Sequence, residues 1–165
     1  MATTLVSVEE YLNTHFAEID REYIDGRLVE RNLGERSHSY AQVEICFFFR
    51  SMGRKNVFVY TEQRVQVART RFRVPDVCVY IGADPTEQVF RTPPFLAVEI
   101  LSKDDRPADL QEKIQDYRTF GVKYIWVIDP ATSCGYVYTR DARHDAATEL
   151  WTKDPDFALP LAQLF

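Results

Sequence analysis

Apolar and polar positions follow two kinds of spacing along this 165-residue chain, one typical of helices and one typical of strands. The spacing predicts, in chain order, a helix over 7–18, a hairpin over 22–31, a helix over 37–52 and a β-ribbon formed by 56–67 and 72–81. Ser7 and Glu10 have the spacing of a capping box, and Asp25-Gly26 is a strong signal for a hairpin turn. The second helix is apolar around most of its circumference, so we expect Ser37 to cap it and both the sheet and another element to cover it.

The second half of the chain predicts a strand–helix–strand unit followed by shorter strands. Residues 95–101 form an apolar run typical of a strand buried on both faces, although Glu99 interrupts it. The helix predicted over 108–120 ends at Gly121, which suits the C′ position. Further strands are predicted over 123–130, 135–140 and 148–154. This order of elements predicts a single α+β domain over 1–165, similar to an α/β/α sandwich, with one mixed central sheet flanked by helices.

Composition narrows the class of protein. No apolar run reaches the length of a membrane span and the first residues lack a signal-peptide pattern, so we expect a cytoplasmic protein that does not bind membranes. The three cysteines lack the spacing of a zinc site, and we expect them to be reduced. The net charge of −5 argues against a protein that coats nucleic acid. It leaves metal-dependent nucleases open, because these enzymes need acidic residues to hold the metal.

Three ionisable residues stand where a plain core would have apolar ones. Glu99 lies within an apolar strand, and Asp76 follows Pro75 beside a run of strand residues. In the helix over 108–120, Lys113 falls inside the apolar stripe and should face the sheet. Each has a structural explanation when taken alone: a glutamate at a sheet edge, a Pro-Asp turn, and a lysine that snorkels to solvent. Together they predict two buried acids and a lysine around one site, because a buried carboxylate needs a positive partner.

These residues resemble a known nuclease signature. The stretches "VPD" at 74–76 and "VEILS" at 98–102 are similar to the PD-(D/E)XK signature of restriction endonuclease-like nucleases. Four further stretches extend the resemblance to nearly the whole chain: "EYIDGRLVE", "FLAVEILSKDD", "KIQDYRTFGVKYIWVIDP" and "FALPLAQLF". More specifically, they are similar to a large bacterial family of predicted restriction endonucleases. The resemblance implies the restriction endonuclease-like core.

The resemblance also implies a metal-dependent endonuclease that hydrolyses phosphodiester bonds in DNA. Asp76, Glu99 and the backbone carbonyl of Ile100 would hold one or two Mg²⁺ or Mn²⁺ ions, and a lysine would act on the attacking water. The signature lysine should stand two residues after the glutamate, where this chain has leucine. The resemblance therefore transfers its role to Lys113 on the next helix. Lys103, at the end of the same strand, is the competing candidate.

Other residues could contribute to the site, and each has a structural alternative. Glu44 on the second helix could be a further acid of the site or a structural residue, and His38 could face the metal or lie on the surface. Arg69, Arg71 and Arg73 lie on one ribbon and could contact phosphate, although a basic loop is more often solvated.

Two functions of different classes remain open from the sequence. The first is a DNA endonuclease, and the second is a catalytically weak or inactive nuclease-fold domain that binds nucleic acid or protein. The missing strand lysine favours the second, whereas Asp76, Glu99 and Lys113 favour the first. The aromatic ribbon over 56–67 could serve a homodimer, which would suit the cutting of two strands.

Overall fold

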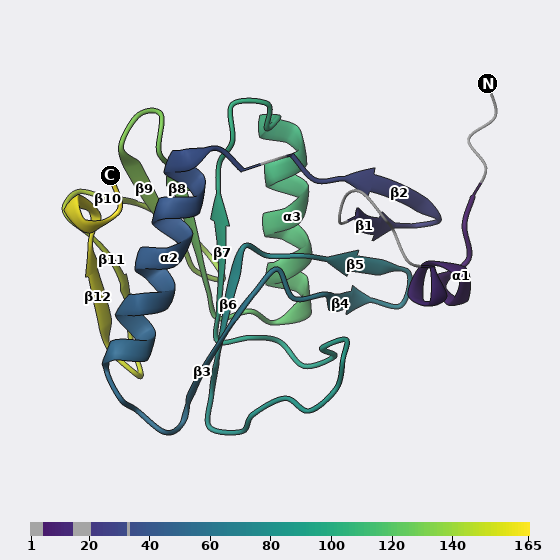
Figure 1. The fold of residues 1–165 in the computed structure, drawn as a ribbon, viewed down its shortest axis with the longest axis horizontal. Helices are drawn as coiled ribbons and strands as arrows, with labels where there is room; N and C mark the ends of the chain where they lie inside the picture. The colour runs from purple at the N-terminus through teal and green to yellow at the C-terminus, as the bar shows by residue number, and fades with distance from the viewer. Residues whose placement is uncertain (1–4, 15–20, 33) are drawn as a thin grey trace.

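The computed structural model describes residues 5–14, 21–32 and 34–165. Figure 1 shows the arrangement of its elements. In chain order these are α1 (Val8–Asn13), β1 (Arg21–Ile24), β2 (Arg27–Glu30), α2 (Arg36–Ser51), β3 (Val57–Thr61), β4 (Val65–Ala68), β5 (Arg71–Arg73), β6 (Val77–Ile81), β7 (Leu96–Ile100), α3 (Pro107–Phe120), β8 (Tyr124–Asp129), β9 (Cys134–Tyr138), β10 (Arg143–Ala146), β11 (Glu149–Thr152), β12 (Phe157–Pro160) and a 3₁₀ turn η1 (Leu161–Gln163).

A six-stranded mixed sheet forms the centre of the molecule. Its strands lie in the order β10-β9-β8-β7-β6-β3, with β7 and β8 parallel and the other neighbours antiparallel. Helix α3 connects β7 to β8 and completes the predicted strand–helix–strand unit. Gly121 ends this helix in the left-handed region with a φ of 105°, as the sequence predicts.

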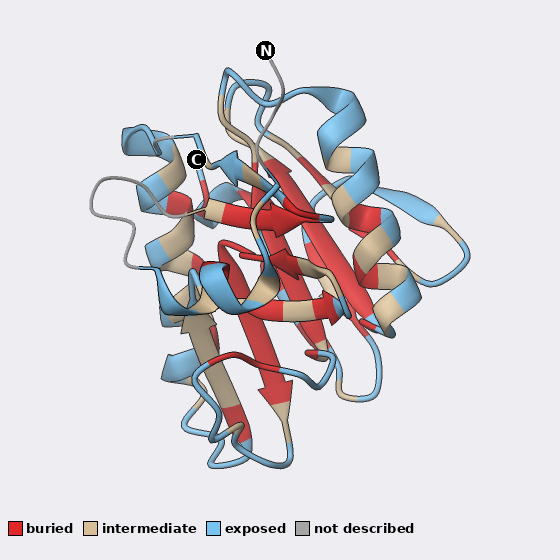
Figure 2. Cartoon of the chain, turned by 90° about the vertical axis from the view of Figure 1, so that its right-hand side faces the viewer, coloured by how far each residue is buried: buried red, intermediate tan, exposed pale blue. Residues whose placement is uncertain are grey.

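Helices α2 and α3 cover opposite faces of this sheet. Alternate residues of β6 divide between two cores, because Val77 and Val79 pack with α2, whereas Cys78 and Tyr80 pack with α3. Figure 2 shows the buried strands with the more exposed helices beside them. The predicted α+β fold, with a mixed sheet flanked by helices, is therefore confirmed.

A four-stranded sheet stands beside the central one and extends to the right in Figure 1. Its order is β2-β1-β5-β4, and the predicted turn at Asp25-Gly26 joins β1 to β2 with positive φ at both residues. The predicted β-ribbon is divided, since β3 and β6 pair in the central sheet while β4 and β5 pair in the smaller one. The division falls at Pro75, which has no N–H for a ladder hydrogen bond.

Helix α2 differs from its prediction at its start. It begins at Arg36, so the predicted cap by Ser37 is wrong. The expected packing against the sheet and another element is confirmed, because the Phe49 ring lies 5.8 Å from Trp126 of β8 and 5.1 Å from Phe157 of β12. Tyr40, Val43 and Phe47 nevertheless remain exposed on the outer face. A helix that is apolar all round can thus be half-covered, since apolar residues are common on protein surfaces.

Local sequence signals predict the start of the first helix but miss some of the short strands. The Ser7 hydroxyl accepts a hydrogen bond from the Glu10 N–H at 3.1 Å, as the capping box predicts. Helix α1 ends at Asn13, and residues 15–18 of the helix predicted over 7–18 lie outside the described residues. Tyr60 of the aromatic ribbon packs within the α3-side core. Strands β10 and β12 are not predicted by the sequence pattern.

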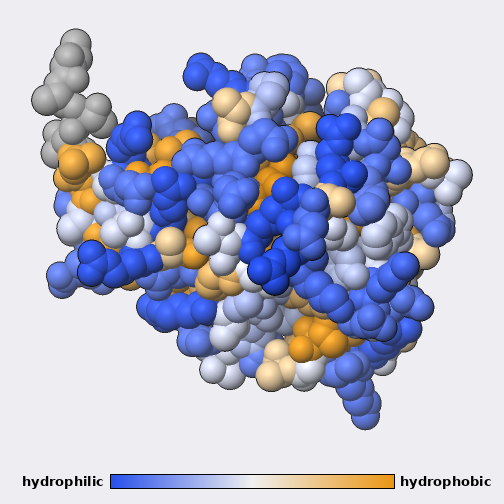
Figure 3. All heavy atoms as spheres, turned by 180° about the vertical axis from the view of Figure 1, so that it is seen from behind, coloured by the Kyte–Doolittle hydropathy of each residue, from blue (hydrophilic) through white to orange (hydrophobic). Residues whose placement is uncertain are grey.

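The surface seen from behind Figure 1 is mainly hydrophilic, with apolar residues in small separate groups (Figure 3). Every helix in the described part of the chain is too short or too polar to cross a membrane.

Candidate active site

Asp76 occupies the place where β6 leaves its neighbour β7. The antiparallel register pairs Val77 with Val98, and its continuation sets Asp76 opposite Glu99. The Asp76 Oδ2 atom accepts a hydrogen bond from the Ile100 N–H at 2.7 Å. The Asp76 side chain thus accepts the hydrogen bond that a backbone carbonyl would accept if the pairing of β6 with β7 continued. This bond fixes the carboxylate beside the end of β7.

Glu99 lies in an interior strand, because β6 and β8 flank β7 on its two sides. The explanation of Glu99 as an edge residue is therefore wrong. Its side chain is 6% exposed, and the Oε2 atom lies 3.1 Å from the Lys113 Nζ atom. The Oε1 atom accepts a hydrogen bond of 2.6 Å from the Tyr117 hydroxyl. Tyr117 stands one helical turn beyond Lys113, and both residues point from α3 onto the same carboxylate.

Lys113 has a second acidic partner that the sequence analysis missed. The Glu22 Oε1 atom lies 3.3 Å from the Lys113 Nζ atom. Glu22 comes from β1, and its side chain is 2% exposed. The sequence does contain a signal for Glu22, because "EYIDG" places this acid on a short strand just before a hairpin turn. Its partner could not be identified, because the pairing of β1 with β5 is a long-range contact.

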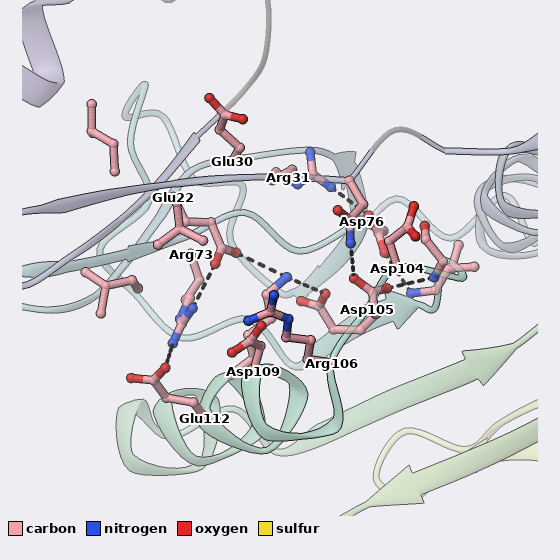
Figure 4. Close-up of a pocket in the computed structure, with 18 of the residues that line it drawn as sticks. Glu22, Glu30, Arg31, Arg73, Asp76, Asp104, Asp105, Arg106, Asp109 and Glu112 are labelled. Carbon is pink, nitrogen blue, oxygen red and sulfur yellow. Dashed lines mark hydrogen bonds and ion pairs between the residues drawn. The ribbon is translucent and has the colours of Figure 1, made fainter.

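Glu22 itself is held by groups from β5 and the segment after it. The Arg73 guanidinium donates to the Glu22 Oε2 atom at 2.8 Å, and the Val74 N–H donates to the Oε1 atom at 3.1 Å. Arg73 also reaches Asp116 on α3, with a closest approach of 2.6 Å. Figure 4 shows Arg73 lying beside Glu22 and Glu112. Arg73 is only 3% exposed, so its alternative as a solvated arginine is wrong, although it is among the residues that line the cavity described below.

Asp76 faces two basic side chains in this structure. The Arg31 guanidinium donates to the Asp76 Oδ1 atom at 2.7 Å, and Figure 4 shows the two side chains pointing toward one another. The His38 Nε2 atom lies 3.4 Å from the same oxygen. His38 is therefore placed at the cavity, and its alternative as a surface histidine is wrong. Arg31 follows β2 directly, so the hairpin delivers it to the site.

The two acids opposite each other have opposite pKa shifts. Burial is the main cause that raises the pKa of Glu99 to about 7. Lys113 and the Tyr117 hydroxyl act to lower this pKa, whereas the charges of Asp76 and Glu22 act in the same direction as burial. Burial also acts to raise the pKa of Asp76, but there the hydrogen bond and charge of the facing histidine, a guanidinium and a backbone N–H lower it. Asp76 thus stays ionised, whereas Glu99 holds a proton more readily.

The pKa values of the basic groups at the site are raised. Burial acts to lower the pKa of Lys113, but Glu99, Glu22 and Asp76 together raise it above its ordinary value. The pKa of His38 is raised, first by its hydrogen bond to Asp76, although burial works in the opposite direction. Two acids with different proton affinities beside a charged lysine are a common arrangement in enzyme sites.

The site opens into a cavity of about 720 Å³. Among the residues that line it are Glu22, Arg31, His38, Asp76, Glu99, Ile100 and Lys113. The structure thus brings together both predicted acids, the predicted lysine and Ile100. Lys103 is not among the lining residues, since it pairs with Glu35 at 2.7 Å and its side chain is 69% exposed. Glu44 is not among them either and lies half-buried on α2.

Arg71 and Arg69 differ from one another. Arg71 contacts Asp25, Glu112 and Asp116, with distances of 2.7, 2.9 and 3.0 Å, so it joins the small sheet to α3. Arg71 is thus part of an ion-pair network and not a solvated loop residue. Arg69 is exposed at the turn between β4 and β5, as its alternative as a solvated loop residue expects.

Comparison with known proteins identifies a family and a similar fold. A family model described as "Uma2: Putative restriction endonuclease" matches residues 8–163. A crystal structure from Anabaena variabilis ATCC 29413, described as a putative nuclease belonging to DUF820, is similar in fold, with a TM-score of 0.84 and 22% sequence identity. The similarity covers 97% of each chain. No curated protein matches the chain.

Proposed function

The chain belongs to the Uma2 family of restriction endonuclease-like proteins, and on this basis we propose that it is a metal-dependent endonuclease that hydrolyses phosphodiester bonds in DNA. The observation that carries the proposal is the position of Asp76, Glu99 and Lys113 around one cavity. A protein without chemistry to perform would be more stable with apolar residues at these buried places.

The donor set fits Mg²⁺ or Mn²⁺. Asp76 and Glu99 offer carboxylate oxygens, which hard cations prefer, and Ile100, whose N–H donates to Asp76, follows Glu99 at the end of β7 and could add its carbonyl. Mg²⁺ is usually held by one or two carboxylates together with water and substrate phosphate, and Asp76 and Glu99 supply that number of carboxylates. When bound, the ion would activate water and neutralise charge on the scissile phosphate.

The chain's own residues divide the remaining work. Lys113 carries a fixed positive charge at the Glu99 end of the site, where it can donate to the attacking water or to a phosphate oxygen. Arg31 stands at the Asp76 end with its guanidinium in the cavity, and a guanidinium can donate two parallel hydrogen bonds to a phosphate. Tyr117 fixes the orientation of the Glu99 carboxylate through its hydroxyl.

The second candidate function is a nuclease-fold domain that binds nucleic acid or protein without cutting. The observation in its favour is that Arg31 and His38 both lie on Asp76, so two basic groups compete with a metal ion there. We retain the enzyme as the main proposal because a domain that only binds does not need the buried pair of Lys113 and Glu99. A homodimer would suit an enzyme that cuts both strands of a duplex, and it is part of the same proposal.

Titration of Mn²⁺ by calorimetry, together with cleavage of supercoiled DNA in the same samples, tests the proposal. We expect wild-type protein to bind Mn²⁺ and to nick DNA, and Asp76→Asn and Glu99→Gln to lose both properties. Lys113→Ala should lose cleavage, and Lys103→Ala, which removes an exposed lysine, should keep it. If wild type binds no Mn²⁺ even with DNA present, the endonuclease proposal fails and the binding domain replaces it.

A further inference from the structure

We propose that Glu22 is a positioning residue, which holds the Lys113 ammonium at the site when the Glu99 carboxylate turns to a metal ion. The inference rests on the proposed function and adds to it a residue outside the acid–acid–lysine signature. Its basis is that one ammonium group lies within 3.3 Å of two buried carboxylates, although only one of them belongs to the signature.

Lys113 needs a second ion-pair partner because its first partner, Glu99, is also a proposed metal ligand. In this structure the Glu99 Oε2 atom faces the Lys113 Nζ atom at 3.1 Å. A divalent cation on Glu99 would weaken that ion pair by competing for the oxygen and by repelling the ammonium. A lysine side chain is flexible and 22% exposed here, so it could turn to solvent. The Glu22 carboxylate, at 3.3 Å, opposes that movement.

Glu22 is rigid enough to serve as an anchor. It accepts hydrogen bonds from the Arg73 guanidinium and from the Val74 N–H, in addition to its contact with Lys113. Arg73 in turn pairs with Asp116, which lies on α3 like Lys113. The ion pairs therefore connect Lys113 to Asp116 through Glu22 and Arg73, and this path begins and ends on α3. Such a path fixes the Glu22 carboxylate relative to the helix that carries the lysine.

The charges along this path also leave the metal ligands free. Glu22 and Asp116 are balanced by Lys113 and Arg73, so the path is neutral without Glu99. Glu99 is thus not needed to neutralise the lysine. Its carboxylate can therefore turn from the ammonium to a cation.

The test is Glu22→Gln, which keeps the shape of the side chain and an oxygen for the Val74 N–H. Arg73 keeps its partner Asp116 in this variant. Acetylation of lysines, followed by mass spectrometry with and without Mn²⁺, reports how accessible Lys113 is, with the exposed Lys103 as internal reference. Mn²⁺ affinity by calorimetry and the kcat and KM of DNA cleavage are measured on the same proteins.

The control is Glu112→Gln. Glu112 is an exposed acid on α3 that pairs with Arg71 and lies 3.6 Å from Arg73, whereas Lys113 forms its ion pairs with Glu22 and Glu99. The Glu112→Gln change therefore removes one negative charge from the same network, while Glu22 keeps its contact with Lys113. If Glu22→Gln does not fold, Glu22→Asp replaces it, because this change keeps the charge and withdraws it by one methylene group.

We expect Lys113 to be protected in wild type and in Glu112→Gln, with and without Mn²⁺. In Glu22→Gln it should be protected without the ion and acetylated at a rate close to that of Lys103 with it. The kcat of that variant should fall by about 100-fold with KM nearly unchanged, which is the usual loss for one misplaced catalytic group.

Two results would overturn the inference. Continued protection of Lys113 in Mn²⁺-loaded Glu22→Gln would show that another group holds the lysine. Loss of Mn²⁺ binding in that variant would show that Glu22 supports the metal ligands themselves. Failure of the proposed function is recognised separately, because it appears in wild type as the absence of Mn²⁺ binding.

Discussion

Replacing Glu99 with glutamine removes a charge that the protein buries at a cost in stability. The pKa of Glu99 is raised from an ordinary 4.5 to about 7, because burial and two neighbouring acids disfavour its ionised form. This difference corresponds to about 3 kcal/mol of unfolding free energy. Glutamine resembles the protonated acid and can still accept the hydrogen bond from Tyr117.

The sign of the effect depends on pH. Below the unfolded value of 4.5, Glu99 is protonated in both states and contributes no penalty. As pH rises from there to about 7, the unfolded chain releases its proton first, so wild-type stability falls. Above about 7 the penalty is complete. His38 contributes a loss over an overlapping range, since its pKa is also raised, but wild type and Glu99→Gln share that contribution.

We therefore expect Glu99→Gln to match wild type near pH 4.5 and to be more stable at about pH 8, by about 3 kcal/mol. In a chain of this length that gain is about 6–12 °C in Tm. Urea unfolding at several pH values measures it, and Glu149→Gln, an exposed acid on β11, is the matched control. A Glu99→Gln protein that is less stable than wild type at about pH 8 would refute the reasoning, because Glu99 would then contribute as a paired ion.

Three other changes have defined outcomes. Arg31→Ala removes a cation 2.7 Å from Asp76 and should tighten Mn²⁺ binding by about tenfold, and calorimetry that finds equal or weaker binding would contradict the proposed metal site. Arg73→Met takes a buried partner from Glu22 and should lower the unfolding free energy by about 3 kcal/mol, with part of the loss recovered in the Glu22→Gln/Arg73→Met double variant. A urea midpoint equal to wild type in the single variant would disprove that network. Gly135→Ala would set a Cβ atom 2.6 Å from a leucine side chain and should cost about 1–3 kcal/mol, whereas an unchanged Tm would show that the C-terminal segment yields without cost.

The sequence predicts the parts of the fold that depend on local chemistry. The hairpin turn at Asp25-Gly26 and the end of α3 at Gly121 both follow from residues that accept positive φ. The strand–helix–strand unit follows from a buried apolar run and a helical stripe. The division of the β-ribbon between two sheets could not be predicted, because it depends on how β1 pairs with β5 over a long sequence separation.

The candidate site divides in the same way. Asp76, Glu99 and Lys113 could be singled out because each breaks an apolar pattern. Glu22 was missed, and Arg73 was named only as a possible phosphate contact, since a glutamate and an arginine on short strands normally lie at the surface. Their burial results from the packing of the small sheet against α3, which brings Asp116 to Arg73. Charged residues that are paired by tertiary structure leave little trace in a single sequence.

The place of the lysine on a helix instead of the strand has a structural reason. Leu101, where the signature expects lysine, donates its N–H to the Ile128 carbonyl and packs against the core under α3. From α3, on the same side of the sheet, the Lys113 Nζ atom reaches Glu99 at 3.1 Å. Because a lysine side chain is flexible, its charge can be delivered from the helix instead of the strand, but the same flexibility lets it turn away. The Glu22 carboxylate, 3.3 Å from the same ammonium, is the second partner that opposes this movement in our proposal.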